Sequence, residues 1–341
     1  MEDNFEKQLI KVLNEKKEIP SIVRMSLDST YDRIRTSPKK KNKVVWKIAT
    51  VVCCIVISGA LASNESVRAS IKTFFNFNDK GVEKAVNEGF INENSISAYD
   101  NGIKVTLESY FADSNKIGLS FKLKFDDSKI LNGIDKVSLD YRIKNGNGEY
   151  IEESIPDTKP LKGKSQYISN GSEKNSELDL KNNEVQYDVI LESNEGSIPR
   201  LENAVVEVET VKFFKNDKKF KGIDGIWNLE LNGGKSNAVN SVEYKVENNT
   251  SKIEIISAKS SPTSFNVTFA VDGEYKDENR FSSKNMKLTN ENGKEYQSSG
   301  YSMESKDNKT IIATNFPLSS YDNIDKLKLI IASIGEVELI K

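Results

Sequence analysis

Residues 103–125, IKVTLESYFADSNKIGLSFKLKF, decide the fold class of this chain. Apolar and polar residues alternate on both sides of the Asp113-Ser114-Asn115 turn, first from Ile103 to Leu107 and then from Ile117 to Phe125. Strict alternation places every second side chain on the same face of a strand, so one face is buried and the other is solvated. The stretch therefore predicts two antiparallel strands joined by a short turn.

Similar patterns continue to the C-terminus, with further strands predicted near residues 137–143, 187–191, 205–214, 226–231, 253–258, 265–271, 310–313, 327–332 and 337–340. Asn145-Gly146-Asn147-Gly148 and Asn292-Gly293 have the composition of hairpin turns. The polar residues 157–183 are expected to form a long loop. Strands at this density, without helical periodicity, indicate a mainly β fold built from sandwiches.

The β-rich part divides near residues 233–250, where Gly, Asn and Ser dominate. We expect two tandem Ig-like β-sandwich domains, over residues 82–235 and 236–341. The turns at 113–115 and 261–263 occupy matching places, because each joins two alternating strands. Packing explains the apolar residues of both domains, and no ligand site is singled out there.

Before the β-rich part lies the apolar stretch VVWKIATVVCCIVISGALAS, residues 44–63. At 1.5 Å per residue it extends about 30 Å, the thickness of a bilayer core. We therefore predict one transmembrane helix. A buried helix of a soluble domain is the alternative, but such helices rarely are apolar on every face.

The charges beside the stretch predict its orientation. Four lysines come just before it and Lys47 lies in its first turn, whereas Arg68, Lys72 and Lys80 follow at comparable distances. The positive-inside rule then places the N-terminus in the cytoplasm and the β-rich part outside. The lysines before the stretch are Lys39, Lys40, Lys41 and Lys43.

Small residues at the outer end of the stretch make a protease a second expected partner. Ala60, Ala62 and Ser63 fit the pattern of a signal-peptidase site. The region before the stretch is too long for an ordinary signal peptide, so an uncleaved anchor is preferred over an N-terminal leader. Regulated cleavage near Ala62 stays a hypothesis.

Residues 1–43 are the predicted cytoplasmic segment, and residues 1–36 within it have helical periodicity in two amphipathic parts that Pro20 separates. About 40 residues without a metal or a disulfide cannot bury enough surface to fold alone. Their apolar faces are therefore expected to bind a protein by docking into a groove, with the inner membrane leaflet as the alternative. The expected partner-binding residues are Phe5, Leu9, Val12, Leu13, Ile22, Val23 and Leu27. Residues 64–81 form a further predicted amphipathic segment, juxtamembrane, with Val67, Ile71, Phe74 and Phe75 on one face.

The composition excludes several kinds of site. The chain has 341 residues, no histidine, and cysteines only at Cys53 and Cys54, so triads, Cys-His dyads and histidine-ligated zinc are excluded. Asp126-Asp127 and Glu152-Glu153 resemble solvated loop charges rather than catalytic pairs. We therefore expect no enzyme, no cofactor and no metal site.

Charge is divided unevenly along the chain. Residues 1–43 carry more Lys and Arg than Asp and Glu, and the overall charge is −2, so the β-rich part is acidic. An acidic body does not favour nucleic-acid binding.

Taken together, this layout resembles the single-pass membrane anti-sigma factors of low-GC Gram-positive bacteria, which pair with an extracytoplasmic-function sigma factor. The resemblance rests on Ile19-Pro20-Ser21-Ile22-Val23 followed by Pro38-Lys39-Lys40-Lys41, and on IEIISAKSSPTSFNVTFAV at 253–271. It implies cytoplasmic helices that sequester a sigma factor and extracellular β-domains that sense envelope conditions. The zinc-binding anti-sigma signature is absent, because it needs histidine and a Cys-x-x-Cys motif. An anchored surface protein whose β-domains bind a cell-wall or extracellular ligand is the alternative.

Overall fold

The protein is described by a computed structural model, and residues 1–74 lie outside the described part. Strands dominate the remainder, so the predicted mainly β fold is confirmed. The described residues are 75, 77–93, 95–163, 167–176, 178–216, 218–231, 241–249, 251–275 and 278–341.

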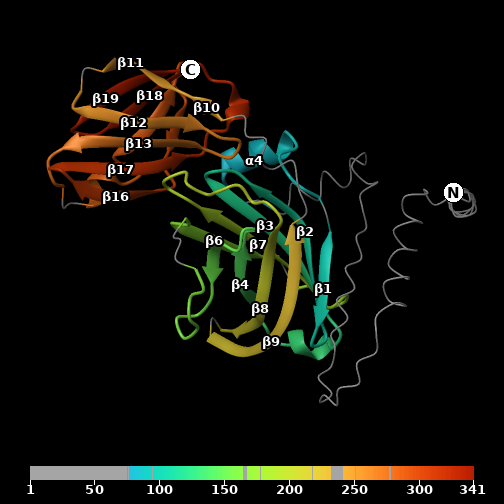
Figure 1. The fold of residues 1–341 in the computed structure, drawn as a ribbon. Helices are drawn as coiled ribbons and strands as arrows, with labels where there is room; N and C mark the ends of the chain where they lie inside the picture. Colours follow the sequence, from blue (N-terminus) through green and yellow to red (C-terminus); the bar gives the residue numbers. More distant parts are fainter. Residues whose placement is uncertain are drawn as a thin grey trace, which may run out of the picture. The chain divides into compact units, whose positions relative to one another are not determined.

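Two antiparallel sheets form a first sandwich, drawn from cyan to yellow in Figure 1. Alternating side chains from both sheets meet in one core, which includes Leu107, Phe121, Tyr141 and Trp227. One sheet has the order β1 (Ile96–Asp100), β2 (Ile103–Ala112), β3 (Lys116–Phe125), β7 (Glu184–Glu192), β6 (Asn170–Asn175). The other has the order β5 (Tyr150–Ser154), β4 (Lys136–Lys144), β8 (Ala204–Lys215), β9 (Lys218–Leu231).

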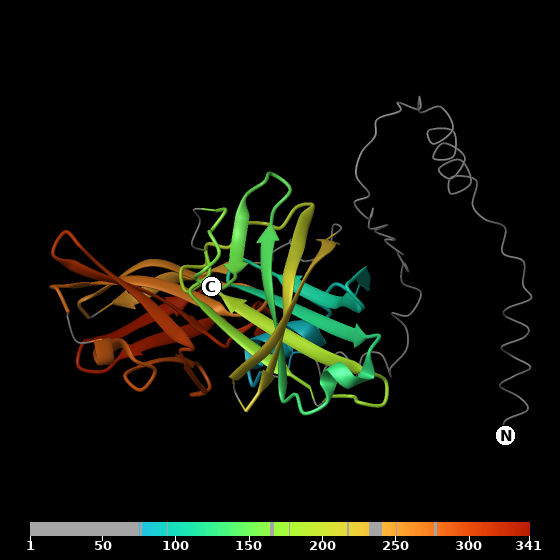
Figure 2. The ribbon, with the colours of Figure 1, turned by 90° about the horizontal axis from the view of Figure 1, so that it is seen from below.

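A second sandwich, orange to red in Figures 1 and 2, has its own core around Phe265, Phe269, Phe281 and Leu329. Its first sheet has the order β10 (Val242–Glu243), β12 (Ile253–Ser260), β13 (Phe265–Asp272), β17 (Lys309–Phe316), β16 (Gly300–Lys306). Its other sheet has the order β11 (Lys245–Asn249), β19 (Gly335–Ile340), β18 (Lys326–Ile331), β14 (Met286–Asn290), β15 (Glu295–Gln297).

The two sandwiches repeat one topology. The orders β2-β3-β7-β6 and β5-β4-β8-β9 of the first recur in the second as β12-β13-β17-β16 and β15-β14-β18-β19. Read as strands A to G with an added C′, this is the A-B-E-D and C′-C-F-G arrangement of immunoglobulin-like domains. The Ig-like class predicted from the alternation is therefore confirmed, and the matching turns are the two A–B hairpin turns.

The polar stretch 157–183 is not one long loop, which corrects the expectation. Residues 170–175 form β6, which pairs with β7 from Asn170↔Glu192 to Asn175↔Tyr187. Strand β6 reads NGSEKN and contains no apolar residue, so it lacks the alternation that indicates a strand. Pairing with a neighbouring strand holds it in place.

A single α-helix, α4 (Lys80–Asn87), was also missed in the described part of the chain. Its N-cap is Asp79, whose carboxylate accepts hydrogen bonds from the backbone N–H of Gly81 at 3.0 Å and Val82 at 3.1 Å. Its apolar face packs against the first sandwich in a small cluster that includes Phe75 and Phe111. The signal lay in Asp79 and the spacing of Val82, Ala85 and Val86.

The two A–B hairpin turns meet each other. The Asp113 carboxylate accepts hydrogen bonds from the backbone N–H of Thr263 at 2.9 Å and from its hydroxyl at 2.7 Å. Asn115 donates from Nδ2 to the Ser264 hydroxyl at 2.9 Å. These groups are buried, so the hydrogen bonds between the two turns satisfy polar atoms that are shielded from water.

Lys116 is a buried cation beside these turns, with about 1 % of its side chain exposed. It pairs with Asp79 and lies 3.7 Å from Glu192, which also accepts a hydrogen bond from Asn315 of the second sandwich at 2.9 Å. Burial alone would lower the pKa of Lys116, but the carboxylates of Asp79 and Glu192 raise it above its usual value. Lys116 therefore stays charged and ties α4 to the first sandwich.

Gly81 explains how close α4 comes to the second sandwich. A Cβ atom placed there would lie 2.1 Å from the carbonyl oxygen of Thr263. Any side chain at this position would push the helix away from the A–B turn of the second sandwich. The helix thus lies against both sandwiches.

Candidate functional site

The expected partner-binding residues lie outside the described part of the chain. The same holds for the span at 44–63, for Ala60, Ala62 and Ser63, and for residues 64–74 of the juxtamembrane segment. Among the residues that are described, no helix has the length and hydrophobicity that a membrane crossing requires. The anchor and the cytoplasmic head therefore remain predictions. The partner-binding set is Phe5, Leu9, Val12, Leu13, Ile22, Val23 and Leu27.

The two acidic pairs have different environments. Asp126 and Asp127 are exposed in a turn, as expected, and Asp127 caps the short helix η1 (Ser128–Leu131). Glu152 and Glu153 are not solvated loop charges, which corrects the expectation, because both lie on the edge strand β5. Edge strands can carry inward-facing charges. The position of this pair on β5 indicates where the candidate site lies.

Register places the two glutamates on opposite faces of β5. Glu152 lies opposite the buried core residue Ile143, so it faces the interior of the sandwich. Glu153 lies opposite Arg142 and pairs with its Nε at 2.5 Å on the outer face. Although burial works in the other direction, the N–H groups of Lys162 and Gly163 together with Arg142 lower the pKa of Glu153.

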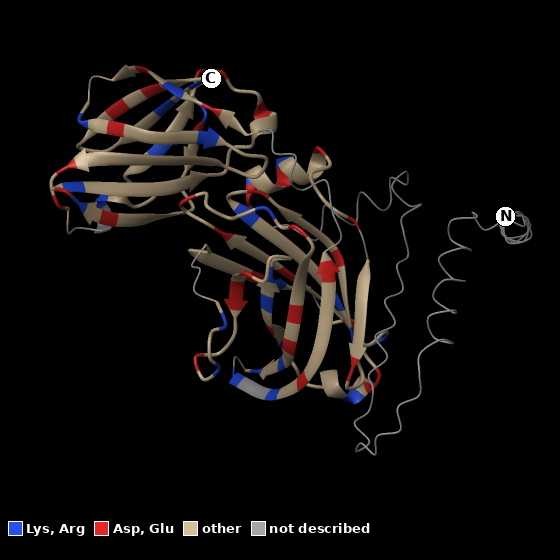
Figure 3. Cartoon of the chain, in the orientation of Figure 1, with Lys and Arg blue, Asp and Glu red and all other residues tan. Residues whose placement is uncertain are grey.

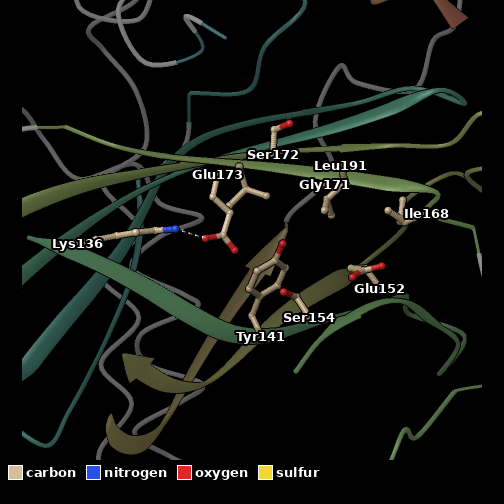
Figure 4. A pocket seen from close by; sticks show the side chains of 10 residues that line it. Lys136, Tyr141, Glu152, Ser154, Ile168, Gly171, Ser172, Glu173 and Leu191 are labelled. Atoms are coloured by element: carbon tan, nitrogen blue, oxygen red, sulfur yellow. Dashed lines mark ion pairs between the residues drawn. The ribbon is translucent and has the colours of Figure 1, made fainter. Parts of the chain in front are cut away.

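A pocket of about 420 Å³ opens where the edges of the two sheets face each other, between β5 and β6. Figure 4 shows the Tyr141 ring rising from β4, with Glu173 and Glu152 on either side of its hydroxyl group in this view. The lining residues are Lys136, Tyr141, Glu152, Ser154, Ile168, Gly171, Ser172, Glu173, Val189 and Leu191. We call this opening the C′–D seam.

The charges in the seam are unevenly matched. Glu173 pairs with Lys136 at 3.5 Å and accepts a hydrogen bond from Ser138 at 3.3 Å. Among the described residues, Glu152 has no such cation: burial raises its pKa to about 7, and the neighbouring charge of Glu153 adds to the effect. A carboxylate with this pKa is partly protonated near neutral pH. The seam therefore presents one uncompensated acid beside the Tyr141 and Ser154 side chains.

In the second sandwich the equivalent seam is filled by side chains. Tyr296 of β15 belongs to the core, and Tyr301 and Met303 of β16 pack against it. Tyr301 and Met303 lie opposite Thr314 and Ile312 on β17 and so face inward. In the first sandwich the inward positions of β6 that face Leu191 and Val189 hold Gly171 and Glu173. The first seam stays open because Gly171 and Glu173 are small or charged where the second sandwich has Tyr301 and Met303.

Acidic and basic residues are interspersed on the described strands of both sandwiches in Figure 3. Several of them form ion pairs across neighbouring strands, such as Lys124 with Glu184 at 3.0 Å. Within the described ranges, no group of three or more acidic or cysteine side chains could hold a metal ion. We therefore consider the C′–D seam as the candidate site for a small ligand.

Part of this chain is similar to known proteins. Residues 39–125 match the model of a family described as a domain of unknown function, DUF4179. A solved structure, the crystal structure of the conserved domain protein from Bacillus anthracis, is similar at 17 % identity and a TM-score of 0.45. The similarity covers 71 % of this chain and 77 % of that one. No curated protein matches. The family match ends at Phe125, the last residue of β3, so it stops before the residues of the C′–D seam.

Proposed function

We propose that this chain is a membrane-anchored anti-sigma factor with an extracellular β-rich sensor. The observation that carries the proposal is the division of the sequence into a basic head, an apolar span and an acidic β-rich body. The head has apolar faces but is too short to bury them by itself, so it needs a partner. In this proposal it sequesters an extracytoplasmic-function sigma factor at the inner membrane face.

The β-rich body suits an extracellular sensor. Its described residues contain no cysteine, so its stability does not depend on the redox state outside the cell. Two sandwiches joined by buried polar contacts can also respond to a ligand or to a change of conditions. Release of the sigma factor would follow cleavage near Ala62, because a single helix is a poor lever for transmitting an outside event.

The head is tested by recovering its partner from cells that carry the tagged full-length chain. Leu9→Asp places a charge on the predicted apolar face, whereas Asn14→Asp places the same charge on the opposite face of the same helix. Wild type and Asn14→Asp should recover similar amounts of a sigma factor. Leu9→Asp should recover roughly one tenth of that amount or less. Equal recovery by the two variants, or no sigma factor with wild type, would contradict the proposal.

Topology and cleavage need separate tests. Protease added to intact protoplasts should degrade the β-rich body and spare the head, and a protected body would overturn the topology. Ala60→Phe combined with Ala62→Phe keeps the span apolar but removes the small residues that a protease would recognise. This variant should abolish both the stress-induced fragment and the response of a sigma-factor reporter.

An anchored surface protein whose β-domains bind a cell-wall or extracellular ligand is a second candidate. The open C′–D seam favours it, because such a pocket is a common form of small-molecule site. In this case the head is idle, and deletion of residues 1–36 would leave the function of the surface domain unchanged. The same deletion would abolish sigma-factor control in the first proposal.

A further inference from the structure

The residues that line the C′–D seam of the first sandwich have the composition of a binding pocket rather than of an incompletely packed core. Its inward positions could hold apolar side chains, as Tyr301 and Met303 do in the second sandwich. A Cβ at Gly171 would meet only the Leu191 side chain, at 3.4 Å, which is ordinary contact. Space therefore does not force a glycine here.

Edge protection alone does not account for these residues. One inward-facing charge is enough to discourage pairing with another sheet, and Glu173 with its partner Lys136 provides one. Glu152 adds a second inward carboxylate that forms no ion pair with any lysine or arginine of the described chain. Leaving a half-buried acid without a cation is costly. A ligand that supplies the cation would offset that cost.

The chemistry of the ligand follows from the groups that face the seam. Glu152 offers carboxylate oxygens, and Tyr141 and Ser154 offer hydroxyl groups that both donate and accept hydrogen bonds. Lys136 at the rim is already paired with Glu173. Val189 and Leu191 of β7 add a small apolar wall. A volume of about 420 Å³ lies within the usual range for small-molecule sites.

We propose that the C′–D seam binds a small polar molecule with a primary amine, whose ammonium group pairs with Glu152 and whose hydroxyl or amide groups contact Tyr141 and Ser154. An ammonium fits better than a neutral donor because a charge-assisted hydrogen bond is about twice as strong as a neutral one. The inference goes beyond the proposed function, since it holds whether or not the head binds a sigma factor.

A matched pair of probes tests the charge requirement. Glucamine and sorbitol are both linear polyols that differ in one terminal group, an ammonium in glucamine and a hydroxyl in sorbitol. Binding to the full-length chain, purified in detergent, is measured by the transverse relaxation of the ligand protons. Glucamine should bind with a Kd on the order of 1–10 mM, and sorbitol at least roughly tenfold more weakly. Equal relaxation for the two probes, or none with glucamine at about 10 mM, would overturn the proposal.

Three variants locate the site. Glu152→Gln should weaken glucamine binding roughly tenfold, because it removes the charge and keeps the shape. Gly171→Met should also abolish binding, because it fills the seam as Met303 fills the second one. Glu295→Gln makes the same chemical change on β15, the equivalent strand of the second sandwich, and should leave binding unchanged. If the folded Glu152→Gln chain binds glucamine as tightly as wild type does, the ligand lies elsewhere and the proposal is wrong.

Discussion

The first and second sandwiches share every strand of an eight-stranded topology but differ at one edge. In the second sandwich Tyr296, Tyr301 and Met303 close the space between strands C′ and D. In the first sandwich the same space is a pocket, because Glu152 and Gly171 stand at inward positions. Backbone pairing thus determines the fold, and a few side chains on edge strands decide whether it contains a pocket.

The difference also shows how stability and binding compete. A closed seam buries aromatic surface, which stabilises the second sandwich. An open seam gives up this burial and holds a carboxylate whose charge is poorly solvated. Four substitutions would sharpen or break this contrast, and the expected effects decrease from the first to the last.

The largest effect is expected from Phe281→Ala in the core of the second sandwich, where the ring packs against Tyr301 of the closed seam. Phe281 is fully buried and its ring contacts Tyr301 at 6.4 Å and Tyr275 at 5.7 Å between centroids. Removing the ring leaves a cavity, so the free energy of unfolding of the second sandwich should fall by about 4 kcal/mol. Urea denaturation followed by tyrosine fluorescence measures this. A loss below about 1 kcal/mol would mean that Phe281 does not support the closed seam.

Lys116→Met should come next, because it removes the buried cation that ties α4 to the first sandwich. Glu192 would remain buried, and Asp79 partly buried, without this partner, at an expected cost of about 3 kcal/mol. Lys124→Met on the same strand is the control, since its ion pair with Glu184 is exposed and should contribute less than about 1 kcal/mol. Calorimetry should show a lower thermal midpoint for Lys116→Met than for wild type and for Lys124→Met. An unshifted midpoint for Lys116→Met would show that this buried ion pair does not stabilise the protein.

Glu152→Gln tests the open seam through pH. The pKa of Glu152 in the folded chain is about 7, above its ordinary 4.5, so the folded state binds this proton more tightly than the unfolded state. The resulting stabilisation is complete below the ordinary pKa and is lost as the pH rises to about 7. Between about pH 5 and pH 8, wild type should therefore lose on the order of 1–2 kcal/mol more than Glu152→Gln.

Asp188 titrates in the same window and is unchanged in both chains, since burial raises its pKa to about 7 as well. The difference between the two chains therefore isolates Glu152. Parallel pH profiles of the two unfolding free energies would show that Glu152 is solvated and that the seam does not bury it.

The smallest effect is expected from Glu295→Gln on the outer face of β15. Glu295 pairs with Lys287, but both side chains are substantially exposed. Exposed pairs contribute little, so the thermal midpoint should change by an amount equivalent to less than about 0.5 kcal/mol. A shift as large as that of Glu152→Gln would remove the contrast between the inner and outer faces of the edge strands.

Most of the central strands could be predicted from alternation, because the period of two is a local property of the chain. The hairpin turns were predictable for the same reason, since Asn292-Gly293 and similar pairs carry their own turn preference. The edge strands β5 and β6 were not. Strand β6 has no alternating apolar residues, and β5 has the adjacent glutamates 152 and 153 that look solvated until strand pairing places them on opposite faces.

By itself, the sequence determined the mainly β class, the two Ig-like units and the matching A–B turns, because strand and turn preferences act between neighbouring residues. Only the tertiary structure decided that those turns meet and that the first seam is open. Asp113 and Thr263 are 150 residues apart, and Glu192 and Asn315 are 123 apart. Contacts over such separations depend on how the strands and sheets pack once they have formed. No local sequence pattern therefore encodes them.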